Sequence, residues 1–382
     1  MTVGSQQAEV IERYAGSIVP AITAATITAF YLYDVAEAID LAALRREFGG
    51  SAAAAQFVPK TSTPSYVQYA SPPVVVDGEA AGIADIDGFD ARLKFFDYGV
   101  ISVALTRPFR GDWAELLSLS QKYIENDALE QQVEAACRSV VARYGAAMRD
   151  GRAKWLYEDY LVFSVTQLET PTTAEELLAG RSEEIALLLR GERQALSRQE
   201  QDEILRSRLS YLATDLVVAT WNAAFVLDTE PGTQAALEVF EFANSQLLEF
   251  RYYDELLDAA LARIYPRLQR QSGVDSLLGR GYIRAARELH ALFVDVNEIT
   301  DRTENALKMI GDIFAARLFQ LVSARLGVGM WKARVDDKLE TLDDIYRFAV
   351  EQVAISRGQF LELTIVAILV FELVLFFMGL MT

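Results

Sequence analysis

The sequence predicts an α+β protein: a duplicated β-α-β-β-α (ferredoxin-like) body, a long antiparallel helical hairpin, and one C-terminal transmembrane helix. Three observations support this fold class. Strand-like and helical segments alternate up to Pro231, in two stretches that share one order. After Pro231, apolar residues recur at steps of three and four, the spacing of long packed helices. Residues 360–381 are almost entirely apolar.

The composition indicates a large core under an acidic surface. The chain has 382 residues, of which 52% are hydrophobic and 24% charged, and its net charge is −18. This length suggests two or three domain-sized units. The acidic surplus argues against nucleic acid as a partner, because phosphate binding needs clustered Lys and Arg.

The sequence contains few of the side chains that commonly bind metal ions or act as nucleophiles. The chain has one cysteine, Cys137, and one histidine, His290. This inventory allows no internal disulfide and nearly excludes classical zinc sites and Ser-His-Asp catalysis. Cys137 falls on the apolar side of a helical segment and is interpreted as a small buried hydrophobe. We expect no cofactor and no metal.

The first α+β unit is assigned to residues 24–150, after an N-terminal tail, 1–23, that lacks the basic start of a signal peptide. AATITAFYLYDV favours a strand, and DLAALRREF before a Gly pair favours a helix. A hairpin is expected with its turn near Asp97-Tyr98-Gly99, followed by two helices. Asp112 is a candidate N-cap, with Glu115 completing a capping box.

The second α+β unit, 151–231, repeats this order. WLYEDYLVFSVTQL is strand-like, residues 172–180 and 182–191 are helical, and residues 207–228 form another hairpin candidate. RLKFF at 92–96 matches RLSYL at 208–212, and each is followed by an acid and a Val-rich strand. A β-α-β-β-α unit used twice is the simplest account.

Residues 232–359 are assigned to long helices. The first follows Pro231 and is expected to bend near Pro266. The second runs from Tyr282 to Leu326, and LGVGMW supplies a turn before the third. Their apolar seams predict an antiparallel hairpin. The seam positions are Leu289, Leu292, Val296, Ile299, Thr303, Ala306, Ile310 and Ile313 in one helix, and Leu339, Leu342, Tyr346, Ala349, Val353, Ser356 and Phe360 in the other.

The stretch 360–381, FLELTIVAILVFELVLFFMGLM, is assigned to a transmembrane anchor. Its 22 residues span about 33 Å, enough to cross a hydrocarbon layer of about 30 Å. Arg347 and Arg357 precede it and no basic residue follows, so the positive-inside rule keeps the amino-terminal body cytoplasmic. We therefore expect a tail-anchored, single-pass protein of the inner (cytoplasmic) membrane, with Thr382 on the far side.

Two acids interrupt this apolar stretch. Glu362 lies near the cytoplasmic edge, where its side chain reaches the interface. Glu372 lies near mid-span, where an ionised acid costs about 3 kcal/mol. Ten residues separate them, so they point about 80° apart on one helix. We expect Glu372 to face a neighbouring helix, with Gly379 on roughly the same face to permit close approach.

Two segments resemble the required-for-meiotic-nuclear-division family. They are LEFRYYDELLDAALARIYP at 248–266 and LELTIVAILVFE at 361–372. The first contains Arg251, Tyr252, Tyr253, Asp254 and Glu255, and the second carries the Leu-Glu, apolar run, Glu pattern. The resemblance covers roughly residues 27–382 and implies a bacterial-type member of a family without established catalytic residues. The chain departs from it by lacking an organelle-targeting amino terminus and by having Leu363 where many members have Trp.

The expected function is a non-enzymatic scaffold or tether at the cytoplasmic face of the membrane that self-associates through its long helices and anchor. One alternative is an enzyme whose carboxylates and tyrosines act as acid and base. Its candidates are Tyr157, Glu158, Asp159 and Tyr160, or Tyr252, Tyr253, Asp254 and Glu255. The second alternative is an oligomeric pore lined by a ring of Glu372 side chains. The expected partners are the lipid bilayer and further copies of the chain.

Overall fold

The computed structural model describes residues 21–54, 72–83, 85–269, 283, 286–287, 291–294, 296 and 313–377. The chain divides into two compact units. The first comprises residues 1–249 and 306–329, and the second comprises residues 250–305 and 330–382.

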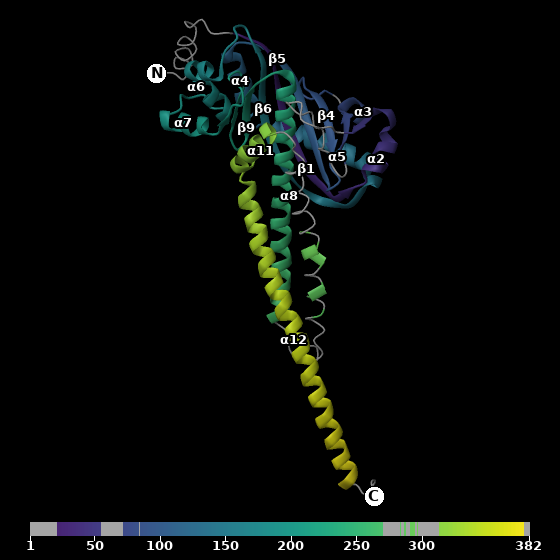
Figure 1. Cartoon of the computed structure of the whole chain (residues 1–382). Helices are drawn as coiled ribbons and strands as arrows, with labels where there is room; N and C mark the ends of the chain where they lie inside the picture. The colour runs from purple at the N-terminus through teal and green to yellow at the C-terminus, as the bar shows by residue number, and fades with distance from the viewer. Residues whose placement is uncertain are drawn as a thin grey trace, which may run out of the picture. The chain divides into compact units, whose positions relative to one another are not determined.

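A mixed sheet forms the centre of the first unit (Figure 1). The strand order in the described residues is β2-β3-β4-β5-β1-β6-β9-β8-β7. The two longest strands, β1 and β6, pair side by side in the middle. The strands are β1 (Ile22–Ile39), β2 (Ala52–Ala54), β3 (Val74–Asp77), β4 (Asp90–Phe95), β5 (Val100–Gly111), β6 (Met148–Leu168), β7 (Arg208–Leu209), β8 (Leu216–Ala219) and β9 (Ala223–Leu227).

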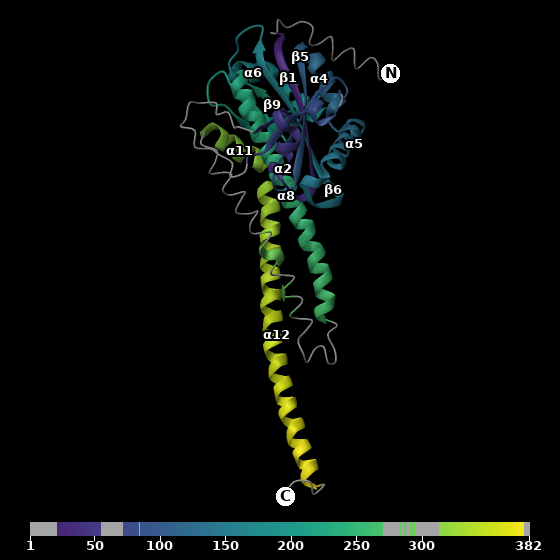
Figure 2. The ribbon, with the colours of Figure 1, turned by 90° about the vertical axis from the view of Figure 1, so that its right-hand side faces the viewer.

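Both faces of this sheet are covered by helices. On one face, Trp113 of α4 packs on Phe225 of β9 with ring centroids 5.8 Å apart. On the other, Phe240 of α8 stacks on Tyr160 of β6 at 5.3 Å. Figure 2 shows α5 and the first half of α8 on opposite sides of β1 and β6. The helices are α2 (Leu41–Phe48), α3 (Gly78–Ala81), α4 (Trp113–Tyr123), α5 (Asp127–Tyr144), α6 (Ala174–Arg190), α7 (Arg198–Arg206), α8 (Glu230–Gln269), α11 (Ile313–Leu326) and α12 (Val328–Phe377).

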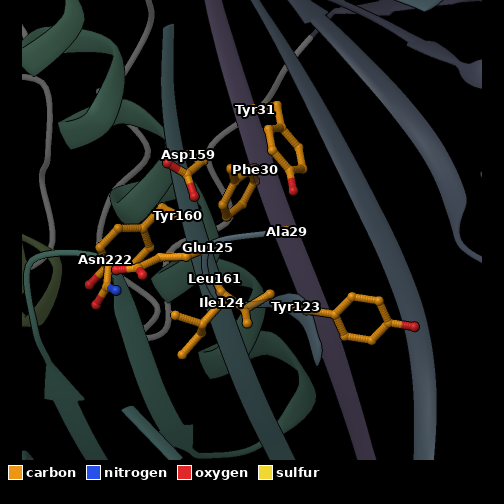
Figure 3. A pocket seen from close by; sticks show the side chains of 10 residues that line it. All are labelled: Ala29, Phe30, Tyr31, Tyr123, Ile124, Glu125, Asp159, Tyr160, Leu161 and Asn222. Carbon is orange, nitrogen blue, oxygen red and sulfur yellow. The ribbon is translucent and has the colours of Figure 1, made fainter. Parts of the chain in front are cut away.

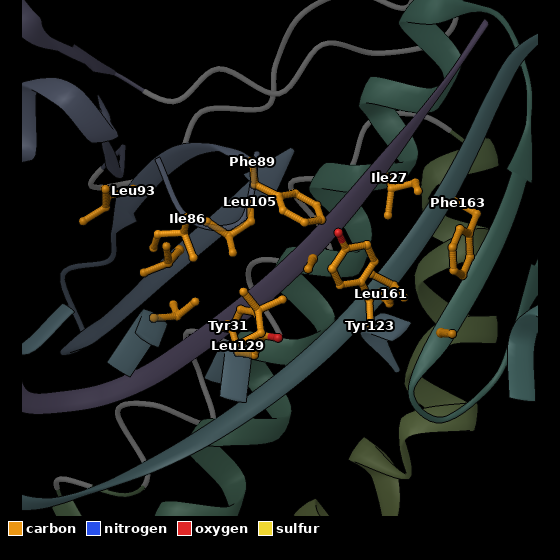
Figure 4. Close-up of a cluster of buried hydrophobic side chains, with 14 of the residues drawn as sticks. Ile27, Tyr31, Ile86, Phe89, Leu93, Leu105, Tyr123, Leu129, Leu161 and Phe163 are labelled. Atoms are coloured by element: carbon orange, nitrogen blue, oxygen red, sulfur yellow. The ribbon is translucent and has the colours of Figure 1, made fainter. Parts of the chain in front are cut away.

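The main hydrophobic core lies between the sheet and α4, α5 and α6. Alternate residues of β1 point into it, because successive side chains of a strand face opposite sides. Tyr31 and Tyr33 are thus in this core, whereas Phe30 and Leu32 are buried under α8. Figure 4 shows Ile27 and Tyr31 of β1 beside Leu161 and Phe163 of β6 within this cluster.

The face under α8 contains a buried ion cluster. The Lys94 ammonium of β4 donates to Glu238 at 2.7 Å and also contacts the Glu241 carboxylate. Desolvation raises the pKa of Glu241, and the Lys94 charge opposes that shift. Nearby, the hydroxyls of Tyr98 and Ser245 are 2.9 Å apart. Removing either charged partner would leave an uncompensated buried charge, so this cluster fixes how α8 sits on the sheet.

Several local predictions are confirmed. β4 and β5 form the expected hairpin, and Gly99 in its turn has φ of 94°. Asp112 and Glu115 form a reciprocal capping box at the start of α4. The two predicted helices near residue 181 are joined in α6 at Arg181, which has non-helical torsion angles. The predicted long helix is α8, which continues past Pro266 to Gln269, and the bend expected near Pro266 stays a prediction.

The predicted duplication is not confirmed, although the chain is α+β with a large sheet. β1 pairs with β5 in the antiparallel direction, whereas the equivalent pair in the second stretch, β6 and β9, is parallel. The shared side-chain pattern at 92–96 and 208–212 therefore does not reflect one repeated topology. Most of the second long helix expected from Tyr282 lies outside the described residues. Its described end is α11, and Gly327, with φ of 71°, makes the turn into α12.

Gly99→Ala should lower the free energy of unfolding by about 2–4 kcal/mol. A Cβ on Gly99 would lie 1.9 Å from the Ala36 carbonyl oxygen, and φ at this position is 94°. Denaturant titration of the detergent-solubilised chain measures the effect. The matched control is Gly145→Ala, where a Cβ meets nothing within 4 Å and φ is −58°, so its effect should stay below about 1 kcal/mol. Equal stability of the two variants would contradict the strained turn.

Ionisation of Asp34 should lower the free energy of unfolding as the pH rises from about 4 to 6. Burial raises the pKa of Asp34 from 3.8 to about 6, and the Arg152 guanidinium 2.6 Å away only partly opposes this shift. The folded protein therefore holds the proton more tightly than the unfolded chain. The contribution is fully present below about pH 4 and is lost by about pH 6, amounting to about 3 kcal/mol.

The measurement is the free energy of unfolding of wild type and Asp34→Asn between pH 4 and pH 7. Asn cannot titrate, so the difference between the two proteins isolates this carboxyl group. Wild type should lose about 3 kcal/mol relative to the variant across that range. Parallel pH profiles would show that Asp34 has an ordinary pKa.

Candidate functional site

The WLYEDYL segment lies in β6, where strand alternation separates its polar residues. Tyr157 and Asp159 stand opposite Tyr33 and Tyr31 of β1, on the face covered by α5. Tyr160 lies on the other face, where its hydroxyl donates to the carbonyls of Thr220 or Ala223 at 3.0 and 2.9 Å. The four residues that the sequence grouped as one candidate catalytic set therefore do not form one site.

Cys137 is fully buried in α5, and burial raises the pKa of its thiol. A thiol held neutral inside the core is a poor nucleophile, as the sequence indicated. His290 lies outside the described residues. The described part of the chain contains no group of three His, Cys, Asp or Glu side chains placed to hold a metal ion.

A small hollow lies on the α5 side of β1 and β6 (Figure 3). Its walls come from four parts of the chain: β1, the loop between α4 and α5, β6, and the turn between β8 and β9. Tyr31 and Asp159 flank it as directly opposite residues of neighbouring strands. The sequence did not indicate this site, because its residues are scattered. The lining residues are Ala29, Phe30, Tyr31, Tyr123, Ile124, Glu125, Asp159, Tyr160, Leu161 and Asn222.

The RYYDELLD motif lies in the second unit, on the part of α8 that begins at Phe250. The Asp254 carboxylate pairs with Lys338 of α12 at 2.6 Å and with Arg334 at 3.9 Å. Lys338 also pairs with Asp258 at 2.7 Å and donates to the Asp254 carbonyl at 3.1 Å. Because one lysine bridges successive turns of α8, the motif links two helices.

Aromatic contacts support the same interpretation. The Arg251 guanidinium lies 6.0 Å from the ring centroid of Trp331, over its face. Tyr252 and Tyr253 contact each other edge to face, with ring centroids 5.2 Å apart. Glu255 is exposed. Arg251 meets residue 331, Asp254 meets 334 and Asp258 meets 338, so α8 and α12 run in parallel here.

Sequence reasoning missed the α12 partners of this motif. A signal was present: Trp331, Arg334 and Lys338 recur at steps of three and four beside the apolar seam. The seam itself is close to its prediction up to Ala349, with Ile345 rather than Tyr346 buried. Beyond it Val353 is only partly buried and Phe360 is exposed. The buried positions of α12 are Val328, Val335, Leu339, Leu342, Ile345 and Ala349.

The end of α12 is a long apolar surface that no side chain of the described residues covers. α12 contains one stretch long and apolar enough to cross a membrane, and none of that stretch is buried. Glu362 and Glu372 both lie on the exposed helix surface, and Gly379 lies outside the described residues. The exposed large apolar residues here are Phe360, Leu361, Leu363, Ile365, Val366, Ile368, Leu369, Val370, Phe371, Leu373 and Val374.

Comparison with known proteins corrects the family assignment made from the two segments. A family model described as "Uncharacterized protein MJ0711, N-terminal domain" matches residues 24–234. The uncharacterized protein MJ0711 of the archaeon Methanocaldococcus jannaschii is 24% identical over 290 residues, 75% of this chain and 81% of the relative. No solved structure matches.

The resemblance to the required-for-meiotic-nuclear-division family is therefore wrong. Its evidence was one motif that pairs α8 with α12 and one apolar helix with two acids. Charged pairs and apolar runs of this kind serve helix packing and membrane insertion in unrelated chains, so they do not identify a family. The matched range instead contains the strands β2 to β9 and nearly all of β1. The chain belongs to the family defined by the N-terminal domain of MJ0711.

Proposed function

We propose that this protein is a non-enzymatic, membrane-anchored scaffold or tether that self-associates through α12. The observation that carries the proposal is the uncovered apolar stretch at the end of that helix. Eleven exposed large apolar side chains between Phe360 and Val374 would be costly in water, because each buries favourably only in an apolar medium. A bilayer supplies that medium.

The orientation follows from charge. Arg347 and Arg357 precede the apolar stretch, and the chain has no Lys or Arg after Arg357. Because basic residues are retained on the cytoplasmic side, we infer that the sheet-containing unit lies in the cytoplasm and that α12 crosses the cytoplasmic membrane once. Glu362, near the edge of the stretch, then lies at headgroup level.

Self-association is supported by the position of Glu372. At about 100° per residue, Glu362 lies about 200° and Glu372 about 120° around the helix from Leu342, which is buried. Both acids thus point away from the side of α12 that packs in the second unit. A carboxyl group in mid-span finds a hydrogen-bond partner most readily on another copy of α12.

A scaffold also fits the chemistry of the described residues. The polar groups that sequence reasoning offered for catalysis are either divided between the faces of β6 or engaged in helix pairing. Asp254, for example, pairs with Lys338 of α12.

Placing two lysines in mid-span should release the protein from membranes. In the variant Ile368→Lys/Leu369→Lys, each charge costs about 3 kcal/mol at the bilayer centre. The matched control is Phe348→Lys/Ile355→Lys, which changes two exposed apolar residues of the same helix outside the apolar stretch. Wild type and control should remain with the membrane after alkaline carbonate extraction, and the mid-span variant should become soluble. Release of the wild type into the soluble fraction by carbonate would refute the proposed membrane anchor.

Glu372→Leu should weaken self-association, and Glu362→Leu should not. One interhelical hydrogen bond in a membrane contributes about 0.6–2 kcal/mol, so dimerisation should weaken about 3- to 30-fold. Sedimentation of the detergent-solubilised chain over a range of concentrations measures this. A wild type that sediments only as a monomer would refute self-association, and equal effects of the two substitutions would refute the role given to Glu372.

A further inference from the structure

The hollow between β1 and β6 belongs to an acidic surface. Glu125, Asp127, Glu130 and Asp159 form no ion pair in the described part of the chain. Asp127 and Asp159 are close enough to raise the pKa of Glu130, after the larger effects of burial and of Glu134. Burial and the Glu125 charge also raise the pKa of Asp159.

The hydroxyl group of a largely buried tyrosine is directed into the same place. Tyr31 is 3% exposed, so almost its whole side chain is inside the protein. Its hydroxyl makes no hydrogen bond in the described part of the chain and is not among the fully enclosed unpaired polar atoms, so the oxygen itself remains accessible. Figure 3 shows it turned toward the other residues that line the hollow. Asp159 stands directly opposite Tyr31 across the two strands.

An aromatic ring stands beside these groups. Tyr157 lies two residues before Asp159 on the same face of β6, and it is 44% exposed. Its neighbour Trp155 already holds a cation, because the Arg138 guanidinium lies 4.1 Å from its ring centroid. Tyrosine rings attract cations in the same way, through their negative faces.

We propose that this hollow, with Tyr31, Asp159, Glu130 and Tyr157 around it, binds the ammonium group of an amine ligand. An ammonium group donates three hydrogen bonds and carries a compact positive charge. The Tyr31 hydroxyl and the Asp159 carboxylate accept from it, the Tyr157 ring stands beside its stem, and the outer acids attract the rest of a cationic ligand. The site lies in the first unit and does not depend on the membrane anchor.

A metal ion fits the site less well. No three carboxylates of the described residues are arranged as ligands, and hard cations require several oxygen ligands at once. The Asp159 carboxylate, the Tyr31 hydroxyl and the Tyr157 ring are instead a mixed set of the kind that recognises an organic cation.

The test is calorimetric titration of the full detergent-solubilised chain with spermidine and, separately, with a hexalysine peptide. Wild type should bind at least one of the two probes. Asp159→Asn should weaken that binding at least tenfold, and Tyr31→Phe, which removes only the hydroxyl, at least threefold. The matched control, Glu47→Gln, removes an exposed carboxylate of α2 outside this surface and should change binding less than twofold.

The outcomes separate the sources of the amine. Binding of spermidine alone assigns the site to free polyamines. Binding of hexalysine alone assigns it to lysine side chains of a polypeptide. Either outcome supports the proposal. Absence of binding by either probe overturns it. An equal loss in Glu47→Gln also overturns it, because binding would then reflect only net charge. Circular dichroism confirms folding, and Tyr31→Phe decides the matter if Asp159→Asn does not fold.

Discussion

The burial of both faces of β1 is the constraint on which the first unit depends. A strand with Tyr31 and Tyr33 on one side and Phe30 and Leu32 on the other cannot leave either side in water. One layer of helices is therefore insufficient, and the start of α8 must cover the second face. That position buries Lys94 together with the Glu238 and Glu241 carboxylates of α8. These charged contacts fix the position of α8 along the sheet, which apolar packing alone would leave less well defined.

Local features of this fold were predictable, and its strand directions were not. The Asp112 capping box and the turn at Gly99 depend on a few adjacent residues, which the sequence displays directly. The direction in which β6 meets β9 depends on the path of α6 and α7 between them. The match between residues 92–96 and 208–212 is one of residue type alone, because Phe95 and Phe96 are buried whereas Tyr211 and Leu212 are exposed.

The candidate sites show the same division. The apolar end of α12 is contiguous in sequence and was predicted with its two acids. The hollow beside Tyr31 was missed because a β1 residue, a loop after α4 and a turn before β9 contribute to it, and no spacing in the sequence connects them. WLYEDYL was noticed for its acids and tyrosines, but alternation along β6 gives Tyr157 and Asp159 to one surface and Glu158 and Tyr160 to another.

α12 is one uninterrupted helix from Val328 to Phe377, about 75 Å long. A continuous helix fixes both the distance between two of its residues and the angle between their side chains around the helix axis. Inserting one residue between Lys338 and Glu372 would turn the acid by about 100° and move it by about 1.5 Å, whereas inserting seven would nearly restore its facing. The number of residues between Lys338 and Glu372 thus also sets the angle between their side chains around the helix axis. Relatives that keep this angle should differ in the length of the helix by whole heptads.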